Sequence, residues 1–472
     1  MIFLSRILFV FLVVFFAVEK LAAQVEGTMP FMTSLPQVTY YNPAFKPSYK
    51  FSIGLPGSSN FGQYTNNGFT YNDFVSKQNG ILVGDLNKLY GAMKDENYIN
   101  VNIQEDMFRV SLKVNPRLYV TVNATVKGYN RIMLSKDVVG LFANGTDPYV
   151  NSKATLSPKV EALEYLELGY GAAYTLNRKL TIGAKLKMLK GIMNVTTQAS
   201  NFNLSLSDTY AITVNGDANI LTSGIHNLTQ SGYTPSDHWK DYLSNNGLAF
   251  DLGGTYQVND KLQVGLSLID LGSISWNNDV YGYKLDPAKA KYTFEGISIN
   301  DLLNGNPSYT SSLADSLKKK FEFTEGRISG YSTTLPAKMY LTGSYELKRS
   351  IHINAVFFAE QFRGRFMPGF STSISKEFGR RLSTSISYTI SNNSFNNLGA
   401  GISVNLPPIQ IYLVSDNLFP LAFSALQKDL NSYANSTRYF NMRTGINFVF
   451  GWDKTPEKQP YHKSEKSKKS RK

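Results

Sequence analysis

The chain has 472 residues, of which 18% are charged and 13% aromatic, with 36 glycines and no cysteine. Low charge together with abundant aromatic residues argues against disorder. The lack of cysteine excludes disulfides, thiolate nucleophiles, Fe–S clusters and cysteine zinc sites. The formal net charge of +13 raises nucleic acid as a partner, but the basic residues are scattered rather than gathered on one stripe, so we expect no nucleic-acid binding. This composition favours an all-β chain.

Residues 1–23 have the features of a secretory signal peptide. Arg6 precedes a run of twelve apolar residues, 7–18, and two alanines follow before Gln24. The apolar run is too short to span a bilayer as a helix. No later stretch reaches 18 consecutive apolar residues, so we expect an exported chain beginning at Gln24 that is either soluble or a barrel.

Apolar and polar residues alternate in segments of about ten residues through most of the chain. This period of two is typical of strands with two different faces, because successive side chains point to opposite sides. In the clearest segment, five apolar residues from Leu118 to Val126 alternate with polar ones. The same pattern recurs in segments 179–188, 247–258, 381–391, 397–406 and 438–450.

The spacing of the turns favours a membrane barrel over a β-sandwich. Six tight turn signals lie near residues 115–117, 176–178, 259–260, 348–349, 379–380 and 407–408. Short turns on one rim and long loops on the other are typical of outer-membrane barrels. Six short turns, with both termini periplasmic, predict a closed antiparallel barrel of about 14 strands over residues 49–451. The alternative is an array of β-sandwiches, but no fixed domain period or linker supports it.

The polar face of the alternating segments carries several charged residues that we expect to point into the lumen. A charge that faces hydrocarbon costs about 2–4 kcal/mol near the midplane. The predicted lumen is therefore polar, with more basic than acidic residues. Such a lumen would either favour the passage of anions or hold an acidic plug. The interpretation we favour is that the charged residues pair with one another inside a filled barrel. The predicted lumen-facing residues are Arg109, Lys113, Glu167, Lys185, Lys187, Asp251, Lys338, Glu346 and Arg443.

Four long outer loops are expected, at residues 56–105, 128–160, 191–246 and 276–334. Loops of this length are usually functional or disordered. Two of them contain short amphipathic helical patterns, at 84–93 and 311–321. Such helices would either line an apolar groove at the barrel mouth or pack on one another as a lid.

Asp270 and Gly272 interrupt the alternation of the strand that contains them. Asp270 falls at the parity where Leu266 and Leu268 face lipid. Either the strand has already left the membrane at this point, which strand length favours, or a bulge at Gly272 re-aims the chain and opens the wall.

The sequence offers no catalytic or metal centre. The four histidines lack metal-ligand spacing, and no hydrolase elbow, phosphate loop or calcium loop occurs. We therefore expect no enzyme activity, no cofactor and no metal. Residues 452–472 are rich in lysine and serine, and we expect them to form a disordered basic tail in the periplasm.

Several stretches resemble the FadL-type outer-membrane channels, and in particular an uncharacterised Bacteroidetes branch related to PorV-type barrels. Asn42-Pro43-Ala44 is similar to the motif of the N-terminal hatch in that family. Further matches are LSLIDLGSISW, YSTTLPAKMYLTGSYEL, IYLVSDNLF and RTGINFVFG, which follow in order at 266–276, 331–347, 411–419 and 443–451. The resemblance implies a 14-stranded barrel plugged by a short hatch, here residues 24–48.

The resemblance implies two functions. Some members of the wider group import long-chain fatty acids or aromatic hydrocarbons, which leave sideways through the wall, and PorV-type barrels are partners in type IX secretion. The first hypothesis is therefore an outer-membrane channel or carrier for a hydrophobic or amphipathic small molecule. The second is a non-transporting barrel that is an accessory subunit of an outer-membrane protein complex. The polar lumen and the basic tail depart from the importers. We expect membrane lipid as a partner in either case, a hydrophobic ligand in the first and protein partners in the second.

Overall fold

A computed structural model describes residues 26–78, 81–232, 234, 240, 243–294, 315–316, 318–362, 364–391, 394–417 and 438–452. The signal peptide and nearly all of the basic tail that the sequence predicts lie outside these residues.

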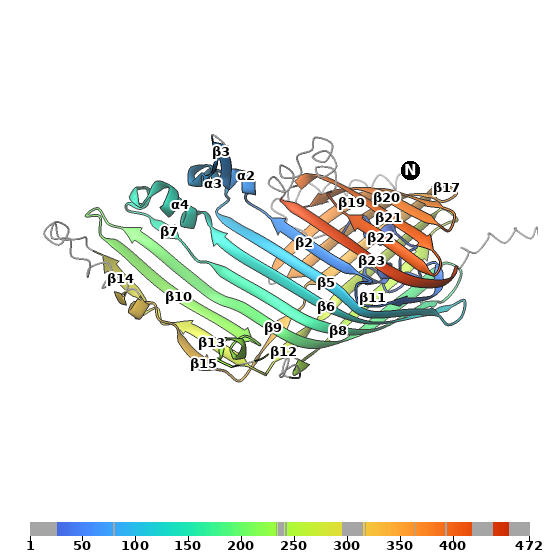
Figure 1. Ribbon diagram of the computed structural model, residues 1–472, viewed down its shortest axis with the longest axis horizontal. Helices are drawn as coiled ribbons and strands as arrows, with labels where there is room; N and C mark the ends of the chain where they lie inside the picture. The colour runs from blue at the N-terminus through green and yellow to red at the C-terminus, as the bar shows by residue number, and fades with distance from the viewer. Residues whose placement is uncertain are drawn as a thin grey trace, which may run out of the picture.

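The chain forms a closed antiparallel barrel of 14 strands (Figure 1). β1 and β2 share one position, and each pairs with β5 on one side and β23 on the other, which closes the barrel. The order around the wall is β1/β2, β5, β6, β8, β9, β11, β12, β17, β18, β19, β20, β21, β22 and β23. The prediction of an all-β barrel of about 14 strands is confirmed.

The wall strands have the following bounds: β1 Tyr49–Gly54, β2 Asn60–Asn66, β5 Glu96–Lys113, β6 Leu118–Ser135, β8 Lys159–Thr175, β9 Leu180–Leu206, β11 Asn245–Gln257, β12 Leu262–Trp276, β17 Ala337–Lys348, β18 Ile351–Phe362, β19 Arg365–Phe378, β20 Leu382–Ser391, β21 Ser394–Leu406, β22 Ile409–Ser415 and β23 Tyr439–Trp452. The smaller strands are β3 Val75–Gln78, β4 Ile81–Gly84, β7 Lys153–Thr155, β10 Ile212–Ser223, β13 Val280–Leu285, β14 Lys291–Phe294, β15 Thr324–Arg327 and β16 Tyr331–Thr334.

The two faces of the wall follow the alternation of the sequence. On β6, Val122 is exposed on the outside, whereas Thr121, Asn123 and Thr125 are buried inside. The outer face carries an exposed apolar band that continues round the barrel, including Ile374 and Ile386. Since an apolar outer band against a polar interior is what a bilayer requires of a barrel, the chain is a barrel of the outer-membrane kind.

The two rims of the barrel differ. On the short-turn rim, the connections between consecutive wall strands span 114–117, 176–179, 258–261, 349–350, 379–381 and 407–408. On the long-loop rim, residues 67–95 join β2 to β5 and residues 136–158 join β6 to β8. Two connections on this rim are short in sequence, because β18 ends at Phe362 and β19 begins at Arg365, and β20 ends at Ser391 and β21 begins at Ser394.

Part of what the sequence suggests as loops consists of strand. β9 is 27 residues long, and only its first half pairs with β11, while Asn194–Leu206 pairs with β10. Together with β13, β14 and β15, this hairpin extends the sheet beyond the barrel (Figure 1). Along Asn194–Leu206 of β9 the apolar and polar residues alternate less regularly than in the wall.

Among the described residues, the named helices are short segments that are not part of the wall. α2 spans Tyr71–Phe74, α3 Leu86–Ala92 and α4 Lys136–Asn144, while η1 spans Met29–Phe31, η2 Pro36–Tyr40, η3 Asp147–Tyr149 and η4 Asn227–Thr229. α3 falls within the amphipathic pattern at 84–93, and the pattern at 311–321 lies partly outside the described residues. Within the described ranges, no helix is both long and apolar enough to cross a membrane.

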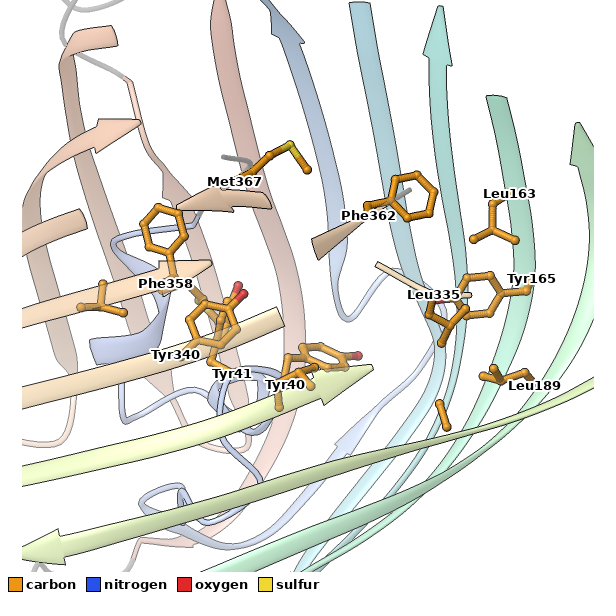
Figure 2. Packing of buried hydrophobic residues seen from close by; sticks show 14 of the residues in the cluster. Tyr40, Tyr41, Leu163, Tyr165, Leu189, Leu335, Tyr340, Phe358, Phe362 and Met367 are labelled. Atoms are coloured by element: carbon orange, nitrogen blue, oxygen red, sulfur yellow. The ribbon is translucent and has the colours of Figure 1, made fainter. Parts of the chain in front are cut away.

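The main core lies inside the barrel and combines residues from the N-terminal segment with residues from the wall. It includes Met29, Leu35 and Tyr41 from the N-terminal segment, and Tyr165 and Phe358 from the wall. Figure 2 shows Tyr40 and Tyr41 beside Tyr340 of β17. The rings of Tyr41 and Tyr340 meet edge to face, with centroids 5.6 Å apart.

Candidate functional site: the hatch and the lumen around it

The N-terminal segment of residues 26–46, called the hatch below, lies inside the barrel. Every residue from Gly27 to Ala44 is buried except Thr33. The backbone-to-backbone hydrogen bonds of the described hatch residues stay within the hatch, as from Met32 to Met29 and from Phe45 to Asn42. The hatch is therefore attached to the wall through side chains and not as an additional strand.

The Asn42-Pro43-Ala44 motif docks on a part of the wall that is lined by glycine. A Cβ added to Gly183 on β9 would lie 2.3 Å from the backbone N of Ala44, and one added to Gly253 on β11 would lie 2.1 Å from Oδ1 of Asn42. Both distances are shorter than real Cβ contacts, so only glycine leaves room for the motif. The side-chain amide of Asn42 donates to the carbonyl of Gly254, at 3.2 Å, while its Oδ1 accepts from the amide of Ala44, at 2.9 Å.

The start of the hatch is held by an ion pair. The guanidinium of Arg443 on β23 binds Glu26 through two parallel contacts, Nε to Oε1 at 2.8 Å and Nη2 to Oε2 at 2.9 Å. The third nitrogen of Arg443 donates to Oγ of Ser59. The side chains of Arg443 and Glu26 are only 2% and 10% exposed. Such a bidentate pair fixes orientation as well as position.

A second charged group holds the middle of the hatch. On β5, Nε of Arg109 lies 3.0 Å from Oδ2 of Asp106, and Nη1 donates to Oγ1 of Thr39 at 3.2 Å. The hydroxyl of Tyr40 donates to Asp106, and the Arg109 guanidinium lies over the Tyr40 ring at 4.1 Å from its centroid. Two predicted lumen residues, Arg443 and Arg109, are thus direct hatch contacts.

Polar side chains of β22, of β23 and of Asp416, the residue after β22, hold the remaining turns of the hatch. Asp416 accepts from the backbone amides of Gly27 and Thr28, at 2.9 and 3.0 Å. The side-chain amide of Gln37 donates to Oδ1 of Asn447 at 2.8 Å, and that of Gln410 donates to the carbonyl of Ser34 at 2.9 Å.

Six buried charged residues form a cluster on the wall, called the ionic cluster below. Lys187 lies 2.6 Å from both Asp251 and Asp270, and Lys127 lies 2.7 Å from Glu167 and 3.4 Å from Asp270. Lys185 completes the set at 3.2 Å from Glu167. Three lysines face three carboxylates, so formal charges in the cluster balance. Four of the predicted lumen residues, Glu167, Lys185, Lys187 and Asp251, are brought together here.

Asp270 reaches the lumen through a bulge in β12. Its φ is +59°, and the register of β11 with β12 shifts between Phe250 and Leu252, so Ile269 and Asp270 together face Asp251. β12 continues past Gly272 to Trp276. The extra residue of a bulge reverses the direction of the side chains that follow it, which explains why Asp270 sits at the parity of the lipid face and is nevertheless 2% exposed.

The other predicted lumen residues lie outside the ionic cluster. Lys338 on β17 is 4.0 Å from Glu360 and 3.4 Å from the hydroxyl of Tyr129. Lys113 and Glu346 are half-buried near the short-turn rim. Several charged residues of the site were not singled out from the sequence, namely Glu26, Asp106, Lys127, Arg131, Glu360 and Asp416. Lys127 lies on the polar face of an alternating segment, so that pattern could have identified it, whereas Glu26 precedes any strand.

A small cavity lies between the hatch and the outer half of the lumen. Its volume is about 40 Å³, and Glu26, Phe61, Tyr129, Lys338, Tyr340 and Glu360 contribute to its lining. Pockets that hold small molecules are usually about 300–1,000 Å³. The cavity therefore has room for a few waters only.

Comparison with models of protein families assigns the chain to a family. The model of a family described as "Family of unknown function (DUF5723)" matches residues 43–416. The chain belongs to the DUF5723 family. The match begins at Pro43 and ends at Asp416, so the ionic cluster lies within it, whereas most of the hatch precedes it and Arg443 follows it. No curated protein matches the sequence.

Several solved barrels are similar to this DUF5723 chain over most of its length. The CymD monoaromatic hydrocarbon channel is 11% identical, with a TM-score of 0.41, covering 91% of this chain and 96% of its own. The Pseudomonas putida toluene transporter TodX is 10% identical, with a TM-score of 0.41, covering 88% and 94%. A Pseudomonas aeruginosa FadL homologue is 9% identical, with a TM-score of 0.41, covering 92% and 100%. Similarity at this level carries nothing about substrate, which must be inferred from the lumen of this chain.

Proposed function

We propose that this barrel is an outer-membrane channel or carrier for a small hydrophobic or amphipathic molecule, and that the hatch is the movable part that closes it. The observation that carries the proposal is the attachment of the hatch. It fills the lumen, yet it contacts the wall through side chains and is not built into the sheet. Side-chain contacts of this kind can break and re-form without unfolding a strand.

The composition of the lumen supports the proposed class of ligand. Beside the polar hatch anchors, the interior presents the buried aromatic residues Tyr165, Trp276, Tyr340 and Phe358. The cavity beside the hatch combines aromatic rings with charged groups such as Lys338 and Glu360. Aromatic surface next to a few polar groups suits a molecule with an apolar body and a polar end.

The orientation follows from the same proposal. We place the short-turn rim and both termini in the periplasm, because periplasmic turns of such barrels are short. The long-loop rim then faces outward and collects the ligand.

A second function is favoured by the sheet that β9 and β10 extend beyond the barrel. A channel needs no such extension, whereas an accessory subunit of an outer-membrane complex, as in the PorV-type resemblance, would use it to bind a partner. The extension carries polar residues such as Asn201, Asp217 and Asn219, joined to one another by hydrogen bonds or to Gln198.

Native mass spectrometry of the barrel, extracted gently from its own membrane, separates the two functions. We expect a stoichiometric small-molecule adduct that is lost when Gly253→Ala disturbs the hatch and retained in Gly254→Ala. A stable polypeptide partner with no small-molecule adduct would contradict the channel and favour the accessory subunit.

A further inference from the structure

The lumen is bridged a second time, on the long-loop side of the hatch, by residues of the wall alone. Arg131 lies near the end of β6, and its Nη2 is 4.0 Å from the sulfur of Met367 on β19. Its guanidinium carbon is also 5.6 Å from the centroid of the Phe362 ring at the end of β18. Arg131, Phe362 and Met367 are called the outer constriction below.

These residues come from opposite sides of the barrel. Between β6 and β19 lie six strands in one direction, β8, β9, β11, β12, β17 and β18, and six in the other, β5, β1/β2, β23, β22, β21 and β20. Neighbouring strands are about 4.8 Å apart, so the path along the wall is about 34 Å in either direction. A contact of 4.0 Å between side chains from opposite strands means that the barrel is pinched at this level.

Arg131 is fixed on its own side of the lumen. Its Nε donates to Oδ1 of Asn100 on β5 at 2.6 Å, and its guanidinium carbon lies 5.6 Å from the Tyr98 ring centroid. On the other side, Phe362 and Met367 are 6% and 3% exposed. Phe362 belongs to the same buried cluster as Leu163 and Tyr165 of β8, and Figure 2 labels all three. The outer constriction is therefore a buried contact between opposite sides of the wall.

A second contact crosses the lumen next to the outer constriction. Nζ of Lys338 on β17 lies 3.4 Å from the hydroxyl of Tyr129 on β6 and 5.4 Å from the centroid of its ring. Four strands, β8, β9, β11 and β12, separate these two residues on the shorter side. Tyr129 and Lys338 also line the small cavity, whose other end is Glu26 of the hatch. The cavity thus lies between two closures.

The chemistry of the outer constriction suits a closure that opens. Phe362 is the last residue of β18 and Met367 is the third residue of β19, so two consecutive strands carry both. Methionine has three rotatable bonds and adapts to many partners, and a cation–π contact is worth only about 0.5–2 kcal/mol. The side chains of Phe362 and Met367 can turn away from Arg131 while β18 stays paired with β17 and β19.

We infer that the lumen has two closures in series, the hatch and the outer constriction, and that a ligand passes only when both have opened. This inference rests on the proposed function, because it treats the lumen as a passage. It assigns to Arg131, Phe362 and Met367 the role of an outer gate made by the wall.

Ion conductance in planar bilayers tests the inference with four full-length proteins. These are the wild type, a loosened hatch (Glu26→Gln, Thr28→Ala, Gln37→Ala), a widened constriction (Phe362→Ala, Met367→Ala) and the combination. We expect widening to raise conductance at least tenfold in the loosened background, while Phe366→Ala leaves it unchanged, because Phe366 is exposed on the outer face of β19.

The outcomes separate this inference from the proposed function. If widening changes conductance less than twofold in the loosened background, the outer constriction is not a closure and the inference is wrong. If loosening changes nothing in the widened background, the hatch is not a closure and the proposed function fails. If the combination conducts no better than the wild type, both are contradicted.

A thiol-modification experiment covers the case in which the widened protein does not fold. Because the chain has no cysteine, Phe362→Cys in the loosened background provides a single reactive site. A bulky methanethiosulfonate reagent should lower the conductance of this protein several-fold, and a reductant should restore it. An unchanged conductance after complete modification would overturn the inference.

Discussion

Gly253 of β11 and Asn42 of the hatch are in such close contact that a Cβ on the glycine would lie 2.1 Å from the Asn42 side-chain oxygen. The same Cβ would lie 2.8 Å from Cδ of Pro43, whose ring cannot rotate away. The next residue, Gly254, faces the other side of the wall, where a Cβ would meet only the Thr181 carbonyl at 3.8 Å. Adjacent glycines therefore give a matched pair of substitutions.

Gly253→Ala should displace the hatch, and Gly254→Ala should not. Overpacking of this kind costs about 1–3 kcal/mol, which the hatch can avoid by leaving the wall. The measurement is the labelling rate of Ser34→Cys by a maleimide, since Ser34 is fully buried in the hatch and its hydroxyl has no hydrogen-bond partner among the described residues. Faster labelling in Gly253→Ala alone is expected, and equal rates in the two variants would show that the glycine does not position the motif.

Glu26→Gln should weaken the attachment of the hatch to the wall and should destabilise the protein much more than a substitution that removes a surface ion pair. It leaves the Arg443 guanidinium buried beside a neutral partner, and breaking a buried pair costs about 3–5 kcal/mol. The pair of Asp286 with Lys289 is a suitable control, because it spans 3.9 Å and its lysine is 83% exposed. Lys289→Ala should change stability by at most about 1 kcal/mol. The labelling rate of Ser34→Cys and urea unfolding in vesicles are measured for each variant. Similar effects of Glu26→Gln and Lys289→Ala would contradict the role of the Glu26–Arg443 pair in anchoring the hatch.

Asp270 should tolerate asparagine better than alanine. Both substitutions remove the carboxylate that faces Lys187 and Lys127. Asp and Asn tolerate a positive φ, whereas in alanine this backbone conformation costs about 1–2 kcal/mol. We therefore expect Asp270→Ala to unfold at lower urea concentration than Asp270→Asn. Identical midpoints would mean that the bulge at Asp270 does not require this backbone conformation.

The alternation of the sequence predicts the barrel well because the bilayer imposes it. On β23, Met442 and Ile446 lie outside while Asn441 and Arg443 lie inside, in agreement with the sequence pattern. The ends of the long strands could not be predicted in the same way. Beyond the membrane, β9 pairs with β10 and no longer needs one apolar face, so its continuation to Leu206 resembles a loop.

Contacts across the lumen are also invisible in the sequence. Lys127 and Asp270 are far apart in the chain and are separated by three strands of the wall, yet they lie 3.4 Å apart. The pairing of Arg131 with Met367 depends on the same curvature of the wall. The hatch motif could be identified from its resemblance to a family, but not the glycines that receive it, because glycine recurs in many strands.

The central claim is that passage requires the hatch to move, and a reversible cross-link tests it most directly. Oγ1 of Thr28 lies 2.5 Å from Oγ of Ser387 on β20, so Thr28→Cys with Ser387→Cys should form a disulfide that ties the hatch to the wall. Ile374→Cys with Ile386→Cys is the control, because these residues pair directly on β19 and β20 and are exposed on the outer face of the wall, away from the hatch.

The readout is entry of the hydrophobic probe N-phenyl-1-naphthylamine into intact cells that express each variant. With the hatch tied, the rate should fall to that of cells without the protein, and a reductant should restore it, while the control pair should show no change. Equal rates in the oxidised and reduced forms of the hatch pair would contradict a moving hatch.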